Sequence, residues 1–193
     1  MENLTRKDEK LRQLEAEAKA CKRCRLHKTR TNVVFGSGTA DTEIMLLGEG
    51  PGFTEDQTKI PFSGAAGKHL NSLLHEAGLK REDLYVTNIV LCRPPQNRTP
   101  LPDEIEACRR FLEGHILVIK PKLIVALGRT SARALLGRNI IMGNEHGTLH
   151  SCTYAGVDFK LYITYHPAAA LYGAKAKQTL QEDFKKLGSL SAG

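Results

Sequence analysis

Short apolar runs alternate with amphipathic segments along most of this chain. In the longer segments between the runs, such as residues 65–77 and the segment that begins near residue 102, apolar residues recur at helical spacing. Strands that alternate with helices of this length form a parallel sheet with helices on both faces. The pattern therefore predicts a three-layer α/β/α sandwich around a central, mainly parallel sheet of four strands. The four predicted strands are residues 44–47, 84–89, 123–127 and 160–164.

The remaining segments are shorter or less regular. Residues 3–20 are highly charged and carry a narrow apolar stripe, which indicates an N-terminal helix. A short helix is expected from Gly128 to Leu136, whereas 140–154 is interpreted as irregular structure or a short hairpin. Because no repeat, linker or low-complexity tract divides the chain, residues 1–193 are expected to form one domain, with the first forty residues integral to it.

Composition and charge narrow the function classes. Hydrophobic residues make up 41% of the chain and charged residues 25%, as is ordinary for a globular domain. No apolar run approaches the ~20 residues that a membrane span requires, and the first residues lack the order of a signal peptide. We therefore expect a cytoplasmic monomer without membrane contact. The net charge of +7 favours a polyanionic partner such as a nucleic acid, although many basic proteins bind none.

Two loops that follow predicted strands are candidates for an active site. Gly48-Glu49-Gly50-Pro51-Gly52 follows the first strand, and His166-Pro167 follows the fourth. Ligands bind at the carboxyl ends of strands in open α/β sheets, so the two loops should frame one site. The glycines would let the backbone approach a flat ligand, although an ordinary turn would also use them. A nicotinamide-binding fingerprint does not fit, because it needs glycine where Phe53 stands and an acidic residue where Asn88 stands.

The cysteines suggest a metal centre. Their odd number, five, argues against a disulfide framework in a cytosolic protein. Cys21-x2-Cys24 is a chelating pair, and Cys92 and Cys108 follow it. Four thiolates could hold zinc or an iron–sulfur cluster, and their chemistry leaves both open. Alternatively, Cys108 is a core residue of a helix and Cys92 a free thiol, while Cys152 falls outside the pattern.

In their order and spacing, these motifs resemble the family 4 uracil-DNA glycosylases. The resemblance spans about residues 15–187. It rests on the loop of Gly48 to Gly52, on Pro61-Phe62-Ser63-Gly64, on Asn88, on His166-Pro167-Ala168-Ala169-Ala170-Leu171 and on the four cysteines.

The resemblance implies roles for the residues of the first loop. Gly48, Glu49 and Gly50 would line the uracil pocket and position water, and Phe62 would stack on the base. Family 1 has a water-activating aspartate where Gly50 stands, and family 4 members share its absence. Water would then be held by Glu49 or by backbone groups, in a dissociative reaction without a covalent enzyme intermediate.

Two polar side chains have the chemistry that the base requires. The Asn88 amide offers one acceptor and two donors, which can pair with O4 and N3–H of uracil but not with the amino group of cytosine. His166 would donate to O2, where negative charge develops as the glycosidic bond breaks. Each also has an ordinary alternative, because Asn88 could satisfy loop backbone and His166 could be structural.

The same resemblance implies an apolar wedge that enters the DNA base stack, and this chain departs from the family there. The wedge belongs to the loop after the histidine, which points to Leu171. A second leucine and an arginine commonly follow in the family, whereas this chain has Ala170 before Leu171 and Tyr172 after it.

The implied cofactor is a [4Fe-4S] cluster on Cys21, Cys24, Cys92 and Cys108. The implied partner is uracil-containing DNA, single- or double-stranded, and the sequence has no readable signal for a sliding-clamp contact. Basic residues beside the cysteines could present a surface to DNA phosphates or form a solvated face: Arg23, Arg25, Lys28, Arg30, Arg93 and Arg98.

The expected function is thus that of a monofunctional DNA repair glycosylase, which flips uracil out of DNA and hydrolyses its N-glycosidic bond in base excision repair. The alternative is a catalytically inactive, cluster-bearing nucleic-acid-binding module of the same fold.

Overall fold

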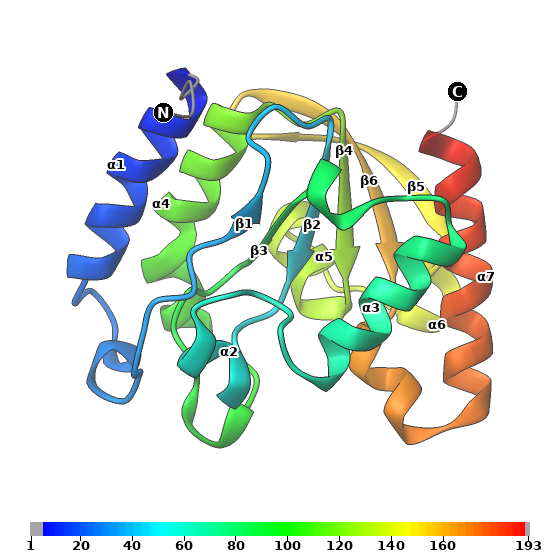
Figure 1. Cartoon of the computed structure of the whole chain (residues 1–193), viewed down its shortest axis with the longest axis horizontal. Coiled ribbons are helices and arrows are strands. Elements are labelled where there is room, and N and C mark those ends of the chain that lie inside the picture. Colours follow the sequence, from blue (N-terminus) through cyan, green and yellow to red (C-terminus); the bar gives the residue numbers. More distant parts are fainter. Residues whose placement is uncertain (1–5, 192–193) are drawn as a thin grey trace.

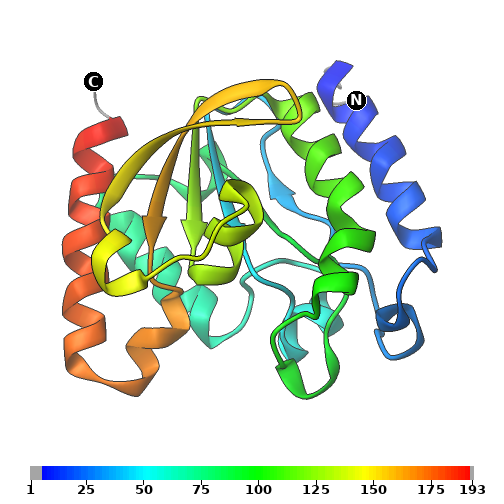
Figure 2. The ribbon, with the colours of Figure 1, turned by 180° about the vertical axis from the view of Figure 1, so that it is seen from behind.

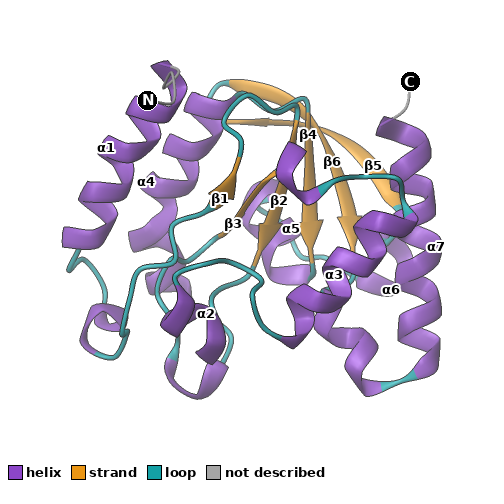
Figure 3. Ribbon diagram, viewed as in Figure 1, coloured by secondary structure: helices purple, strands orange, loops and turns teal. Residues whose placement is uncertain are grey.

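The computed structural model describes residues 6–191, which fold into a six-stranded sheet flanked by helices (Figures 1 and 3). The strand order is β1-β3-β2-β4-β6-β5, and the four central strands are parallel. The predicted sandwich with its parallel centre is confirmed. The strands are β1 (Ser37–Gly38), β2 (Ile44–Gly48), β3 (Tyr85–Asn88), β4 (Leu123–Leu127), β5 (Thr148–Tyr154) and β6 (Val157–Thr164).

The sheet has two more strands than the sequence pattern predicted. β1 and β5 lie at the edges and run antiparallel to their neighbours. β5 pairs with β6 in a hairpin whose turn residues Ala155 and Gly156 both have positive φ. The segment 140–154, interpreted as irregular structure or a short hairpin, holds a one-turn helix at Met142–Glu145 and only the first strand of this hairpin. Edge strands bury less than central ones. In β5 only Cys152 is buried, so no continuous apolar run marked it in the sequence.

Helices cover both faces of the sheet, because successive side chains of a strand point to opposite faces. Met45 and Leu47 of β2 belong to the core beneath α1, α4 and α5, whereas Leu46 belongs to the core beneath α3 and α7. Figures 1 and 2 show these two layers from opposite sides. The helices are α1 (Arg6–Ala20), α2 (Phe53–Thr58), α3 (Ala65–Glu76), α4 (Pro102–Ile119), α5 (Arg129–Leu136), α6 (Met142–Glu145) and α7 (Ala174–Ser191).

Three helices, α2, α6 and α7, were not predicted from the sequence, and the first helix can be compared with its prediction only in part. The predicted first helix began at residue 3, and its first residues lie outside the described part of the chain. α7 was not predicted, although Leu180, Phe184 and Leu187 recur at helical spacing and are fully buried. Within residues 6–191, no helix is both long and apolar enough to cross a membrane.

The strand order places the functional loops together. From β2 the chain passes to β3 on one side of it and later to β4 on the other side. Loops after β2 and β4 therefore diverge and leave a crevice at the carboxyl edge of the sheet. In this register Gly48 pairs with Asn88 at the ends of β2 and β3. In Figure 1 the arrowheads of β2 and β4 point toward this edge, where α2 lies.

Candidate active site

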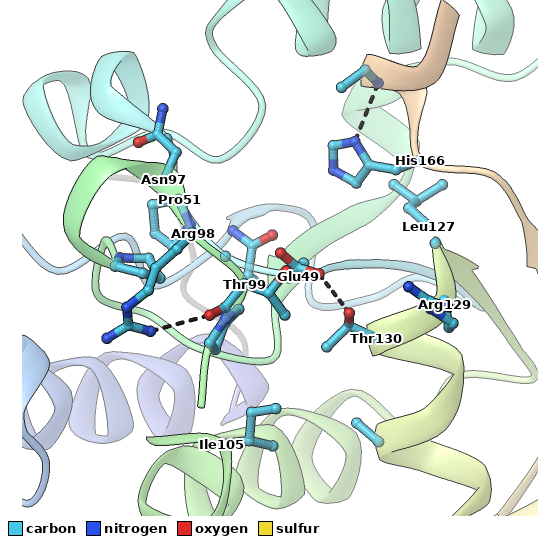
Figure 4. A pocket seen from close by; sticks show the side chains of 18 of the residues that line it. Glu49, Pro51, Asn97, Arg98, Thr99, Ile105, Leu127, Arg129, Thr130 and His166 are labelled. Atoms are coloured by element: carbon cyan, nitrogen blue, oxygen red, sulfur yellow. Dashed lines mark hydrogen bonds between the residues drawn. The ribbon is translucent and has the colours of Figure 1, made fainter. Parts of the chain in front are cut away.

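A cleft of about 840 Å³ opens at the carboxyl edge of the sheet (Figure 4). Loops that follow β2, β3, β4 and β6 all contribute to its walls. Of the residues that sequence analysis assigned to base binding or catalysis, five line it: Glu49, Gly50, Phe62, Asn88 and His166. Gly48 lies directly against two of them. A Cβ at Gly48 would overlap the Asn88 amide oxygen and approach Cζ of Phe62 to 2.7 Å, so only glycine fits there.

The Asn88 side chain lies at the cleft, and the fold does not use the hydrogen-bonding groups of its amide. The residue is buried, with 3% of its surface exposed, at the end of a central strand. Among the residues that the structure describes, none forms a hydrogen bond with its amide, and neither amide atom is sealed from the cleft. The ordinary alternative, in which Asn88 satisfies loop backbone, is therefore not observed. Its donors and acceptor are available to a ligand.

Phe62 adopts a backbone conformation that needs support from its neighbours. Its φ is 54°, an unusual value for a bulky residue. Gly67 of α3 packs against the Phe62 carbonyl so closely that no side chain could be added there, and Arg81 Nη2 donates to the Pro61 carbonyl at 2.5 Å. Thus constrained, the Phe62 ring stacks near the His166 ring, with centroids 5.6 Å apart and planes at 27°.

Glu55 links the glycine-proline loop to the turn that follows Phe62, a role that sequence analysis missed. Its Oε2 accepts from the Gly52 amide at 3.1 Å and its Oε1 accepts from the Gly64 amide at 2.8 Å. One carboxylate thus joins the end of the glycine-proline loop to the turn after Phe62. In the sequence Glu55 is only one residue of the run after the glycine-proline loop, and its place in the first turn of α2 is known from the structure.

The contacts of His166 define its protonation state. Its Nδ1 accepts a hydrogen bond from the Ala168 amide at 3.2 Å, so in this arrangement Nδ1 carries no proton. Burial lowers the pKa of His166, although the carboxylates of Glu49 and Glu55 oppose that effect. The imidazole is therefore neutral at physiological pH, with its proton on Nε2. It caps the following turn through one nitrogen and keeps a donor on the other.

Glu49 has a partner that the sequence motifs did not reveal. Thr130, in the first turn of α5, donates from Oγ1 to Glu49 Oε2 at 2.5 Å (Figure 4). This contact spans the crevice between the loops after β2 and β4. It occupies one carboxylate oxygen and leaves Oε1 without a hydrogen bond among the described residues.

The four cysteines assigned as ligands line one small cavity beside α1 and α4. Arg30 braces this cavity: Nη1 donates to Cys92 Sγ at 3.0 Å and Nη2 to the Cys21 carbonyl at 3.1 Å. Burial raises the pKa of the Cys24 and Cys92 thiols, and that of Cys108 to about 12. Cys152 lies elsewhere, beside the Leu135 carbonyl.

The cysteine geometry can be compared with two kinds of metal centre. Within the described residues, no three His, Cys, Asp or Glu side chains converge as they would on one metal ion. All four cysteines nevertheless line the same cavity, and Arg30 donates a hydrogen bond to one of their sulfur atoms, which suits a thiolate ligand. The residues present therefore fit a metal centre on four thiolates, and their chemistry leaves zinc and an iron–sulfur cluster both open.

The comparisons with known proteins agree with the geometry of the cleft. The sequence model of the uracil DNA glycosylase superfamily matches residues 35–188. The chain belongs to this superfamily. It is 40% identical over 186 residues to the Type-4 uracil-DNA glycosylase of Archaeoglobus fulgidus, covering 94% of each protein. It is 44% identical over 176 residues to the Saccharolobus solfataricus enzyme of the same name, covering 89% of this chain and 82% of the relative. The Thermotoga maritima Type-4 enzyme is 42% identical over 174 residues, with 89% of each covered. The predicted family is confirmed.

Most arginines that sequence analysis assigned to a glycosylase's DNA surface have partners within the protein. Arg98 forms two hydrogen bonds, of 2.7 and 2.8 Å, with the carboxylate of buried Glu104. Arg25 pairs with Asp103 at 2.6 Å. Both ion pairs end on the first turn of α4, where Arg98 reaches it from the preceding loop and Arg25 from the turn after α1. The charge of these two arginines is therefore largely balanced locally.

The loop after His166 exposes two large side chains of this glycosylase-superfamily chain. Leu171, the predicted wedge, is 55% exposed, and Tyr172 is 87% exposed. Tyr172 lines the cleft, whereas Leu171 is not one of its lining residues. The assignment of Leu171 as the wedge stays a prediction.

Proposed function

We propose that this protein is a monofunctional uracil-DNA glycosylase, which hydrolyses the bond between uracil and deoxyribose and leaves an abasic site. The observation that carries the proposal is the convergence of Gly48, Phe62, Asn88 and His166 at one cleft. The relatives named Type-4 uracil-DNA glycosylase support the same activity. A binding module without activity is not favoured, because the chain retains every base-contacting residue that the resemblance implies.

Base selection follows from shape and hydrogen bonding. A flat ring can lie against the face of Phe62, whose ring and the Asn88 amide pack closely over Gly48 at the end of β2. The Asn88 amide then donates to O4 and accepts from N3–H of uracil. Cytosine has an amino group at C4 and no proton on N3, so it meets a donor with a donor and an acceptor with an acceptor. Leaving buried polar groups unpaired in this way is costly, which gives strong discrimination.

His166 acts on the leaving group. When the bond between C1′ and N1 breaks, its electron pair moves to uracil and spreads to O2. The Nε2–H of neutral His166 donates to O2, and this hydrogen bond strengthens as the charge develops. Burial favours the neutral ring, so the donor is an imidazole at physiological pH.

Glu49 supplies the second half of the reaction. Thr130 holds its Oε2, and the remaining oxygen, Oε1, can accept a proton from water. Water attacks C1′ of the cationic sugar, and its proton passes to Glu49. No carboxylate is needed at the position of Gly50, and no covalent bond forms between sugar and enzyme.

We also propose that the four cysteines hold a [4Fe-4S] cluster, which the Type-4 names of the relatives are consistent with. When bound, the cluster would cross-link the segment after α1 to the loop after β3 and to α4. Cys92 and Cys108 bracket the loop that forms one wall of the cleft, so the cross-link would stabilise that wall. DNA of either strandedness as substrate, a monomeric state and a cytoplasmic location are parts of the same proposal.

Incubation with an end-labelled oligonucleotide that contains one uracil tests the activity. The expected product is an alkali-labile abasic site in single strands or duplexes, together with free uracil. A shifted band on a native gel without an alkali-labile site would instead identify a binding module and refute the proposal.

A further inference from the structure

The cleft is larger than a base alone requires, and its far wall carries two arginines. Its volume of about 840 Å³ lies in the upper part of the range for ligand sites, ~300–1,000 Å³. Beyond the residues around Phe62, it continues between α4 and α5. Arg129 and Arg133 line this extension from α5. They are one helical turn apart, so both side chains lie on the same face of α5.

These two arginines differ from the other arginines near the site. Among residues 6–191, neither Arg129 nor Arg133 has an ion pair, hydrogen-bonded side-chain partner or aromatic contact, and both are exposed. By contrast, Arg98 across the cleft is bound to Glu104 through two hydrogen bonds. In the view of Figure 4, Arg98 and Arg129 are on opposite sides of Glu49. The α5 wall is therefore the one with uncompensated positive charge.

Carboxylates near this wall already have partners. Glu49 accepts the Thr130 hydroxyl hydrogen bond. Glu106, which also lines the extension, pairs with Arg109 at 2.9 Å. The Thr130 hydroxyl leaves Glu49 its negative charge, but neither Glu49 nor Glu106 forms an ion pair with Arg129 or Arg133. Their natural counter-charge is an external anion that reaches the cleft together with the base.

We propose that Arg129 and Arg133 bind two neighbouring phosphates of the DNA strand that delivers uracil to the cleft. This inference rests on the proposed function for the identity of the strand. Residues four apart on a helix have Cβ atoms ~5–6 Å apart, and their long side chains can spread to successive phosphates. The strand then runs along α5, opposite the wall of Arg98 and Thr99, with Thr130 and Glu49 beneath the reacting nucleotide.

The salt dependence of DNA binding tests this assignment. Each phosphate neutralised contributes about 0.9 to the slope of log affinity against log salt for a duplex, and about 0.7 for a single strand. For the Arg129→Gln/Arg133→Gln double variant, the slope of log affinity against log salt should therefore be shallower by about 1.8 on a duplex and by about 1.4 on a single strand. Fluorescence anisotropy on uracil-free oligonucleotides of one sequence, across a series of sodium chloride concentrations, measures both slopes.

Two further variants make the comparison specific. Arg129→Lys/Arg133→Lys keeps the charge and should keep most of the slope. Lys10→Gln/Arg12→Gln removes two charges from exposed positions of α1, outside the cleft, and should leave the slope unchanged. All three should match wild type in far-UV circular dichroism.

An unchanged slope in the Gln double variant would overturn the assignment, because no phosphate contact would have been lost. If binding is weaker at that unchanged slope, the arginines contact bases or sugars instead. The slopes are measured on DNA without uracil, so they remain readable if the wild-type protein releases none. In that event the proposed activity fails and the phosphate contacts are still tested.

Discussion

Removing the Thr130 hydroxyl should slow uracil release without weakening DNA binding. Thr130→Val keeps the shape of the side chain but removes the donor that holds Glu49 Oε2 at 2.5 Å. A hydrogen bond to a charged group contributes ~1.5–3 kcal/mol, which corresponds to about 10- to 150-fold in rate if it is needed in the transition state. Thr130 is only half-buried, so water can partly replace the hydroxyl, and we expect a value near tenfold.

Single-turnover kinetics on a uracil oligonucleotide, with affinity measured separately, distinguish positioning from binding. Thr130→Ser keeps the hydroxyl and should restore most of the rate. In a Glu49→Gln background, Thr130→Val should have little further effect, because the group it positions is already altered. If Thr130→Val slows both backgrounds equally, Thr130 acts independently of Glu49 and the proposed positioning is wrong.

The remaining predictions concern the base, the cluster and stability. His166→Ala should slow single-turnover excision by roughly 10²- to 10³-fold with little change in affinity for uracil-free DNA, as expected for one donor to a developing oxyanion; an unchanged rate would refute its role. Asn88→Asp should abolish uracil excision, because a carboxylate cannot donate to O4; wild-type release would mean that Asn88 does not read the base. With a [4Fe-4S] cluster, the wild-type protein should be brown and hold about four iron atoms per chain. Cys108→Ala should lose the colour and the iron, whereas Cys152→Ala should keep both. One stoichiometric zinc in the wild type would contradict the cluster. Burial lowers the pKa of His115 to about 4, against 6.5 when free, so the unfolded state binds a proton that the folded state excludes. The free energy of unfolding should therefore fall by up to roughly 3 kcal/mol as pH drops from about 6.5 to 4. In denaturant titrations, His115→Phe should remove that part of the pH dependence. A variant that follows the wild-type curve would contradict this role of His115.

The parallel centre of the fold was predictable because burial on both faces leaves continuous apolar runs. The runs at Ile44 and Leu123 became β2 and β4, as expected. β5 was harder to predict, since its side chains alternate between exposed and half-buried positions and its pairing depends on β6. Local pattern carries little information about an edge strand whose partner supplies most of its hydrogen bonds.

The same distinction applies to the site. Gly48, Asn88 and His166 could be selected as candidates from the sequence because each lies at or just after the end of a strand and belongs to a motif of known spacing. Thr130 and Glu55 could not, because their roles depend on contacts between loops. Thr130 is 81 positions from Glu49 in the chain, and only the strand order brings them together. The unpaired state of Arg129 likewise follows from where the acidic residues lie in the folded protein.

Comparing three oligonucleotides that differ at one position tests the central claim most directly. The position holds deoxyuridine, deoxycytidine or thymidine, and single-turnover release of the free base is measured for each with the wild-type protein. The cleft formed by Phe62, Asn88 and His166 predicts rapid release of uracil and none of cytosine. Failure to release uracil, or release of cytosine at a similar rate, would contradict the account.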